Sequence, residues 1–166
     1  MNCVKRQSLI MRIREYRDAD LMEIVALFHQ TVHRINIRDY TLQQVNAWAP
    51  DNIDIDAWRE SLAAHNTFVA IDGDTIIGFG DIDDSGYLDR LYVHHAYQGR
   101  GVATALCDRL ETSVRAERIT VHASVTALPF FLRRGYRVVK ERLVERRGVT
   151  LKNYAMERLL APDENQ

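Results

Sequence analysis

The segment with the clearest chemical potential runs from Gln98 to Thr104, where a glycine-bearing loop passes directly into a helical pattern. The first turn of a helix carries unpaired N–H groups and a partial positive charge, which together attract anions. Gly99 and Gly101 let the backbone approach a phosphate closely, and Thr104 adds a hydroxyl donor. The pattern predicts a phosphate site at a helix N-terminus. The alternative is an ordinary glycine-containing turn into a helix.

Two common phosphate motifs do not match this loop. The dinucleotide fingerprint G-x-G-x-x-G/A requires Gly or Ala where this chain has Thr104, and the Gly-Lys-Ser/Thr of a Walker A loop is absent. The residues therefore favour a phosphate-containing ligand of another class.

Length, composition and charge restrict the classes of protein and of binding partner. The chain has 166 residues, 46% of them hydrophobic and 27% charged, which fits one domain with a real core. Its formal net charge of -1 argues against nucleic acid or an anionic membrane as partner. Cys3 and Cys107 have neither metal-ligand spacing nor a disulfide framework, and we expect a cytoplasmic protein. No apolar run approaches the roughly 18 residues of a membrane span.

The elements that must position the loop follow an α/β order. We expect a strand at 12–16, a helix capped by Asp18, a second helix from a capping box at 41–44, and a third ending near His65. Three strands (67–71, 75–82, 87–93), a helix, a strand (119–123), a helix (126–134) and a hairpin (136–145, 150–159) follow. We place the domain at 11–160, with 1–10 as an N-terminal extension and 161–166 as a tail. The alternative for 1–10 is an ordered N-terminal arm.

The loop also resembles a family signature. Gln98-Gly-Arg-Gly-Val-Ala103 is similar to the Q/R-x-x-G-x-G/A motif of the GNAT N-acetyltransferases, with typical flanks of Leu-Tyr-Val before it and Ala-Leu after it. The similarity covers residues 11 to about 160. Ala47-Trp-Ala49 and Asn153-Tyr-Ala-Met156 resemble a bacterial subgroup. The resemblance implies the GNAT fold: a mixed, mostly antiparallel sheet flanked by helices on both faces, with splayed central strands.

The resemblance implies acetyl-CoA as cosubstrate. The strand residues Leu91, Tyr92 and Val93 would pair with the pantetheine arm, and the N–H of Val93 would donate to the thioester oxygen. The pyrophosphate and its surroundings would be held by Gln98, Gly99, Arg100, Gly101, Val102, Ala103, Thr104, Phe131 and Arg134, with Arg133 an alternative phosphate donor.

Asp89 is the candidate general base. It lies four residues before Val93, where many GNAT enzymes place a glutamate, and strand alternation predicts that it shares a face with Leu91 and Val93. Because Asp is short and weakly basic, it would act through a bridging water or with a pKa raised by burial. The alternative is an ion pair with Arg90.

The second family signature departs from its usual form. Phe131 stands at the tyrosine position often proposed to protonate the thiolate, and Phe cannot donate a proton. Ser124 stands where an asparagine is common, and we take it as a catalytic candidate. Ser124, Tyr97, a water or no acid at all remain open, since a thiolate is a tolerable leaving group.

The first two helices fall where the family builds its acceptor pocket. His33, Tyr40 and Trp48 are candidate substrate contacts, together with Asp81. Asp81, Asp83 and Asp89 favour a cationic acceptor. His29 and His33 lack the further ligands of a metal site, so we expect no metal.

We therefore expect an N-acetyltransferase that moves an acetyl group from acetyl-CoA to a primary amine of a small molecule or protein by direct attack. No activated nucleophile for a covalent intermediate is evident. The alternative is a CoA-binding sensor or scaffold without turnover, and a longer acyl donor is a third possibility. We expect a monomer or a homodimer.

Overall fold

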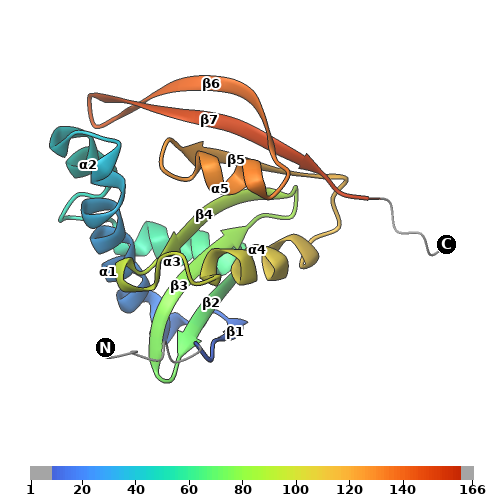
Figure 1. Ribbon diagram of the computed structural model, residues 1–166. Coiled ribbons are helices and arrows are strands. Elements are labelled where there is room, and N and C mark those ends of the chain that lie inside the picture. The colour runs from blue at the N-terminus through green and yellow to red at the C-terminus, as the bar shows by residue number, and fades with distance from the viewer. Residues whose placement is uncertain (1–8, 162–166) are drawn as a thin grey trace, which may run out of the picture.

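The computed structural model describes residues 9–161, which form one seven-stranded sheet with helices on both faces (Figure 1). The expected extension 1–10 and tail 161–166 lie almost wholly outside the described residues. Leu9, at the start of the described part, packs against the core. No helix in the described part combines the length and apolar character that crossing a bilayer requires.

The strands follow the predicted order with small shifts of their ends. The sheet order is β1-β2-β3-β4-β5-β7-β6, and among these neighbours only β4 and β5 run parallel. The bounds are β1 Arg12–Glu15, β2 Asn66–Asp72, β3 Thr75–Ile82, β4 Tyr87–Val93, β5 Arg118–Ser124, β6 Arg137–Arg146 and β7 Val149–Leu159.

The helices also follow the predicted order. The bounds are α1 Leu21–Arg34, α2 Leu42–Trp48, α3 Ile55–Ala64, α4 Val102–Thr112 and α5 Leu128–Arg133. Thr41 and Gln44 form the predicted capping box, and Gly135 takes the left-handed conformation expected after α5. The predicted cap at Asp18 is wrong. A 3₁₀ turn precedes α1, and the carboxylate of Asp20 instead accepts the Arg17 N–H at 2.8 Å.

The sheet divides the core into two clusters. On one face, α4 and α5 cover Ile77, Leu88, Val93, Val121 and their neighbours. On the other, α1, α2 and α3 cover a second cluster that includes Phe79 and the half-buried Tyr92. Alternate side chains of the same strands thus serve different layers, because successive residues of a strand point to opposite faces.

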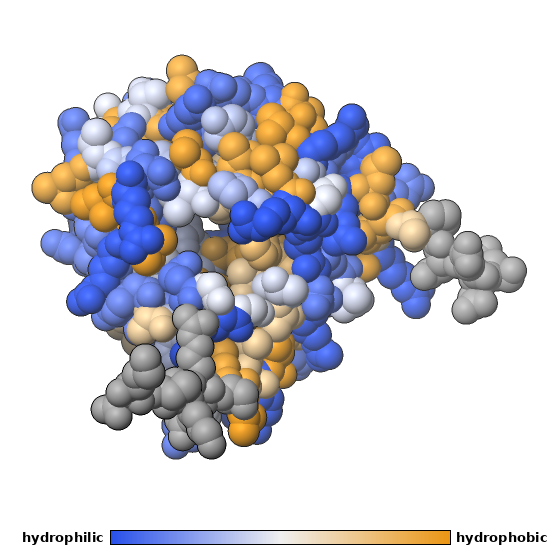
Figure 2. Space-filling model, viewed as in Figure 1, coloured by the Kyte–Doolittle hydropathy of each residue, from blue (hydrophilic) through white to orange (hydrophobic). Residues whose placement is uncertain are grey.

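The splayed central strands are confirmed. β4 and β5 pair at only two positions, Tyr87 with Thr120 and Leu88 with Val121. Beyond Leu88 both strands continue without pairing to each other, and the β6–β7 hairpin lies over the opening (Figure 1). The space-filling view shows a hollow in this face of the molecule, below the hairpin (Figure 2).

Candidate functional site

The open edge of β4 offers unpaired backbone groups. His94 N–H donates to the Ile77 carbonyl at 2.8 Å, so this pair across β3 and β4 is a hydrogen-bonded one. Hydrogen-bonded and non-bonded pairs alternate in antiparallel strands, so the next pair, Gly78 with Val93, directs the Val93 N–H away from β3. The same alternation turns Leu91 outward. Both residues therefore present backbone groups to the splay, where an extended ligand can add as a strand.

The predicted anion cradle follows β4. Gly101 takes φ 81° before α4, and the first hydrogen bond within this helix runs from Ala105 N–H to the Gly101 carbonyl at 3.1 Å. The N–H groups of Val102, Ala103 and Thr104 therefore have no partner within the helix. Gln98 fixes the loop to the strand because its side-chain amide donates to the Val93 carbonyl at 2.7 Å.

Local space fits a phosphate ligand. A Cβ atom added at Gly99 or Gly101 would meet no atom within 4 Å, so both glycines border open space. The Thr126 hydroxyl, buried at the wall of the same cavity, has no hydrogen-bond partner within residues 9–161. A buried polar group without a partner is costly, and a polar ligand would satisfy it.

Two cavities meet at the splay. The first, which we call the loop cavity, has a volume of about 460 Å³ and is lined by the edge of β4, the loop 98–104 and α5. The second, the hairpin cavity, has about 510 Å³ and lies between α1–α3 and the β6–β7 hairpin. Five residues line both cavities: Trp48, Asp89, Tyr92, His122 and Ser124. We call these five residues the junction.

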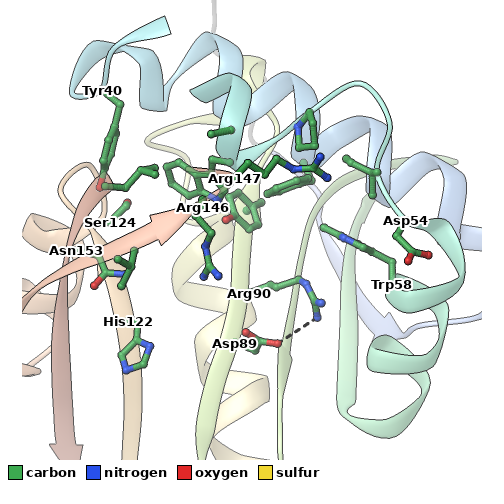
Figure 3. A pocket seen from close by; sticks show the side chains of 18 of the residues that line it. Tyr40, Asp54, Trp58, Asp89, Arg90, His122, Ser124, Arg146, Arg147 and Asn153 are labelled. Atoms are coloured by element: carbon green, nitrogen blue, oxygen red, sulfur yellow. Dashed lines mark ion pairs between the residues drawn. The ribbon is translucent and has the colours of Figure 1, made fainter. Parts of the chain in front are cut away.

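Asp89 reaches the junction because of a β-bulge. Asp81 pairs with Arg90 and Ile82 pairs with Leu88, so Asp89 is an extra residue on β4. Leu88 and Leu91 both pack on the α4 face, so the bulge breaks the alternation between them. The prediction that Asp89 shares a face with Leu91 is therefore wrong. Its carboxylate instead lies 3.4 Å from the Arg90 guanidinium (Figure 3).

Burial tunes Asp89. Its side chain is 31% exposed, and burial raises the pKa of its carboxyl above the ordinary value, against the lowering effect of Arg90. A raised pKa makes the carboxylate a better proton acceptor than a free Asp. The alternative ion pair with Arg90 is thus present, and the role of Asp89 as a general base stays a prediction.

A charge network lies behind Asp89. The ligand atoms of His65, Asp81 and Asp89 lie within 4.8 Å of one another, a grouping compatible with a metal ion. However, Asp81 Oδ2 accepts from His65 Nδ1 and from Arg90, each at 2.7 Å. The Arg90 guanidinium thus supplies the positive charge of the cluster. The hydrogen bond with Asp81 raises the pKa of His65.

Three predicted site residues are engaged elsewhere. Asp81 is fully buried in this network and lines neither cavity, so it is not a substrate contact. His33 Nε2 donates to the Ala49 carbonyl at 2.8 Å, and His33 also lines neither cavity. Arg134 is held by Asp108 and Glu111, each at 2.6 Å, whereas its neighbour Arg133 lines the loop cavity. Arg133 therefore replaces Arg134 as the candidate phosphate donor.

Two further loop residues have defined roles in the fold. The Arg100 guanidinium lies 5.0 Å from the centre of the Tyr97 ring and does not line the loop cavity. Tyr97 lines the loop cavity, but its hydroxyl donates to Asp72 at 2.8 Å, which makes it a weaker candidate for the acid than Ser124.

Other predicted residues lie where a site requires them. Tyr40 lines the hairpin cavity, and its hydroxyl donates to the Lys152 carbonyl at 2.6 Å while accepting the Val125 N–H at 2.9 Å. Ser124 lies at the junction, and its hydroxyl accepts the Ala127 N–H at 3.0 Å. Phe131 is buried in the α4-side cluster and lines the loop cavity.

The sequence reasoning missed several cavity residues. His122, which is not among the predicted site residues, lies at the junction, with Nδ1 3.1 Å from the Tyr87 hydroxyl. Burial lowers the pKa of His122, and the charges of Arg142 and Arg146 lower it further. Figure 3 shows Arg146 pointing into the hairpin cavity, between Asn153 and Arg90. The basic pair Arg146-Arg147 at the predicted turn was the available signal, but its place over the cavity depends on pairing between distant strands.

The fold and site define a class of protein: an α/β protein with an open strand edge and an anion cradle suited to an extended, phosphate-bearing ligand, and with a second cavity that meets the first at the junction. A family model of the acetyltransferase (GNAT) domain matches residues 36–158. The uncharacterized N-acetyltransferase YafP of Escherichia coli K12 is 38% identical over 147 residues, which is 88% of this chain and 94% of that protein.

Solved structures agree. A GCN5-related N-acetyltransferase structure from Rhodopseudomonas palustris, titled "Aminotransferase, Class-II", has a TM-score of 0.87 at 32% identity and covers 90% of this chain and 95% of its own. The structure of yncA from Salmonella typhimurium, a putative acetyltransferase with its cofactor acetyl-CoA, has a TM-score of 0.67 at 19% identity, covering 93% of this chain and 99% of that one. The chain belongs to the GNAT family and is an acyltransferase.

Proposed function

We propose that the protein transfers an acetyl group from acetyl-CoA to a primary amine by direct attack. One observation carries this proposal. The loop cavity, with its anion cradle and strand edge, meets the hairpin cavity at the five junction residues, which include a carboxylate with a raised pKa. Two substrates can therefore approach each other from opposite sides.

The donor side uses mainly backbone groups. Acetyl-CoA is the cosubstrate. Its pantetheine arm adds to the open edge of β4 at Leu91 and Val93, and its pyrophosphate accepts the free N–H groups at the start of α4. Arg133, at the wall of the loop cavity, supplies positive charge near the phosphates. The Val93 N–H donates to the thioester oxygen, where negative charge develops in the transition state.

The acceptor side must supply a neutral amine. An alkylamine has a pKa near 10.4 and is mostly protonated at neutral pH. Asp89 accepts the proton through a bridging water. The amine nitrogen then forms a bond to the carbonyl carbon, and the C–S bond breaks with its electron pair on sulfur.

Ser124 is the candidate that we favour as proton donor to the leaving thiolate. Phe131 has no ionisable proton, but the Ser124 hydroxyl accepts the Ala127 N–H and keeps its own proton free to donate. A thiol pKa near 8.5 also lets the thiolate leave without an acid. Either route completes the reaction without a covalent enzyme intermediate.

A thiol-release assay tests the proposal. Purified protein is incubated with acetyl-CoA and a panel of primary amines, while free thiol is followed and CoA binding is measured by thermal shift. We expect amine-dependent thiol release. Thermal stabilisation by CoA without release on any amine would support the alternative of a sensor or scaffold module, and release only with longer acyl-CoA donors would change the acyl group.

A further inference from the structure

The hairpin cavity combines an aromatic wall with a cationic rim. Phe28, Tyr40, Trp48, Trp58 and Tyr92 line one side of it. Its volume of about 510 Å³ falls within the range typical of small-molecule sites. An acceptor of modest size with an apolar or aromatic body fits this wall.

The basic side chains that line the hairpin cavity differ in whether an acidic partner balances their charge. Four basic side chains line the cavity: Arg90, Arg146, Arg147 and Lys152. Arg90 is compensated by Asp81 at 2.7 Å, and Lys152 by Glu141 at 3.2 Å. The ion pairs of residues 9–161 include neither Arg146 nor Arg147.

The acidic residues of the cavity do not offset these two arginines. Asp89 lies beside Arg90, at 3.4 Å. Asp54 caps α3 by accepting the Ala57 N–H at 3.0 Å. Asp83, which had favoured a cationic acceptor, instead accepts hydrogen bonds from the backbone N–H groups of Ser85 and Tyr87 within its own turn. A cationic acceptor therefore has no free carboxylate cluster to meet.

The two arginines are placed at the cavity by the hairpin turn. Arg147 has φ 48° and Gly148 has φ 76°, the conformation of a tight hairpin turn in which Asn, Asp or Gly is usual at the first position. Arg147 is thus a bulky residue held in a left-handed conformation, which costs about 1 kcal/mol or more. The charge of Arg146 also reaches the junction, because it contributes to the lowered pKa of His122.

We propose that the acceptor carries an oxyanion, a carboxylate or a phosphate or phosphonate group, in addition to its amine, and that Arg146 and Arg147 hold this group. This inference rests on the proposed function. Arg146 and Arg147 are exposed, and the planar guanidinium of arginine pairs with oxyanions in a bidentate geometry that the ammonium of lysine cannot match. The same positive charges favour the neutral form of the nearby amine, which is the form that attacks.

Matched pairs of amines test the inference. Each pair differs only in the anion: 4-(aminomethyl)benzoate with benzylamine, phenylalanine with 2-phenylethylamine, and 3-aminopropylphosphonate with propylamine. We expect the wild-type protein to prefer the anionic member of at least one pair by tenfold or more in kcat/KM. In the R146Q/R147Q variant we expect this ratio to fall toward one. Arg115→Gln removes an exposed arginine just beyond the end of α4 and serves as the control, with the wild-type ratio retained.

Calorimetric binding to the CoA-loaded protein gives a readout that does not need turnover. The anionic member should bind at least tenfold more tightly than its neutral partner, and R146Q/R147Q should abolish the difference. Equal binding of the two members, or equal weakening of both in the variant, would overturn the inference. Turnover without anion preference would overturn this inference alone, whereas anion-dependent binding without thiol release on any amine would overturn the proposed transfer alone.

Discussion

Replacement of Asp89 by Asn tests the chemistry most directly, because the change keeps the shape of the side chain and removes its basicity. General-base catalysis typically contributes 10²–10⁴-fold. Since Asp89 is short and acts through a water, we expect the lower end, a loss of about 100-fold in kcat, or about 2.7 kcal/mol on the barrier. Acetyl-CoA affinity should stay within about twofold, because the proposed cosubstrate contacts are made by the backbone of Leu91 and Val93 and not by Asp89.

The effect on stability should be small. Asp89 is 31% exposed, and an ion pair of this kind contributes at most about 1 kcal/mol. Arg90 also keeps its second partner, Asp81, at 2.7 Å. We therefore expect the free energy of unfolding of Asp89→Asn to fall by less than about 1 kcal/mol, so that lost activity reports on chemistry.

The pH dependence of kcat gives a second test of Asp89. Asp89 must be deprotonated to act, and its pKa is raised by burial. Wild-type kcat should be present above that pKa and lost as pH falls through it, and this acidic limb should be missing in Asp89→Asn. Thiol release measured across pH, with Asp84→Asn as an exposed control in the β3–β4 turn, checks both points. Activity within threefold of wild type with an unchanged acidic limb would remove Asp89 from the mechanism, and His122→Gln would become the next variant to measure.

Three further predictions concern the anion cradle at Gly101, the hydrogen bonds of Tyr40 to two backbone groups, and the charge network of His65 and Asp81. Gly101→Trp should abolish thermal stabilisation by CoA because bulk fills the open space at φ 81°, whereas Gly73→Trp, at a distant turn with φ 60°, should lower the melting temperature without affecting CoA binding. Tyr40→Phe should lower the free energy of unfolding, measured in urea, by about 1–3 kcal/mol, because it leaves the Lys152 carbonyl and the Val125 N–H without partners. The control Tyr16→Phe removes a buried hydroxyl that has no partner in the described residues, so it should not destabilise the protein. The hydrogen bond with the buried carboxylate of Asp81 raises the pKa of His65, so this pair stabilises the fold while His65 is protonated. The free energy of unfolding of the wild type should therefore exceed that of His65→Asn most below pH about 6.5, and the difference should vanish as pH rises through the raised pKa. Unfolding curves that give the same difference at every pH would contradict this interpretation.

Most of the fold could be predicted from local sequence patterns. The capping box of Thr41 and Gln44 and the left-handed Gly135 are set by interactions within a few residues, so their spacing in the sequence was sufficient to predict them. The loop from Gln98 into α4 was predictable for the same reason. Helix and strand ends shifted by one or two residues, which is the usual uncertainty of frayed termini.

Side-chain assignments failed where distant segments decide them. The face of Asp89 depends on a bulge set by pairing with β3, which strand alternation alone cannot reveal. Arg134 and Arg133 are adjacent in sequence, and only the acidic residues of α4 decide that Arg134 is held away from the cavity. Arg146 lines the hairpin cavity because β7 pairs with β5 and carries the hairpin over the splay. These three errors share one cause, namely long-range contacts without a local sequence signal.

The division of the core by the sheet has a consequence for how such a protein can diversify. The loop cavity, where we propose that the cosubstrate binds, lies against the α4 side, whereas the aromatic wall and the hairpin belong to the α1–α3 side. Substitutions far apart with no shared neighbours act nearly independently. The hairpin tip and the aromatic wall can therefore be exchanged to accept a new amine while the donor half stays intact, so that one scaffold supports many acceptors through changes confined to one layer.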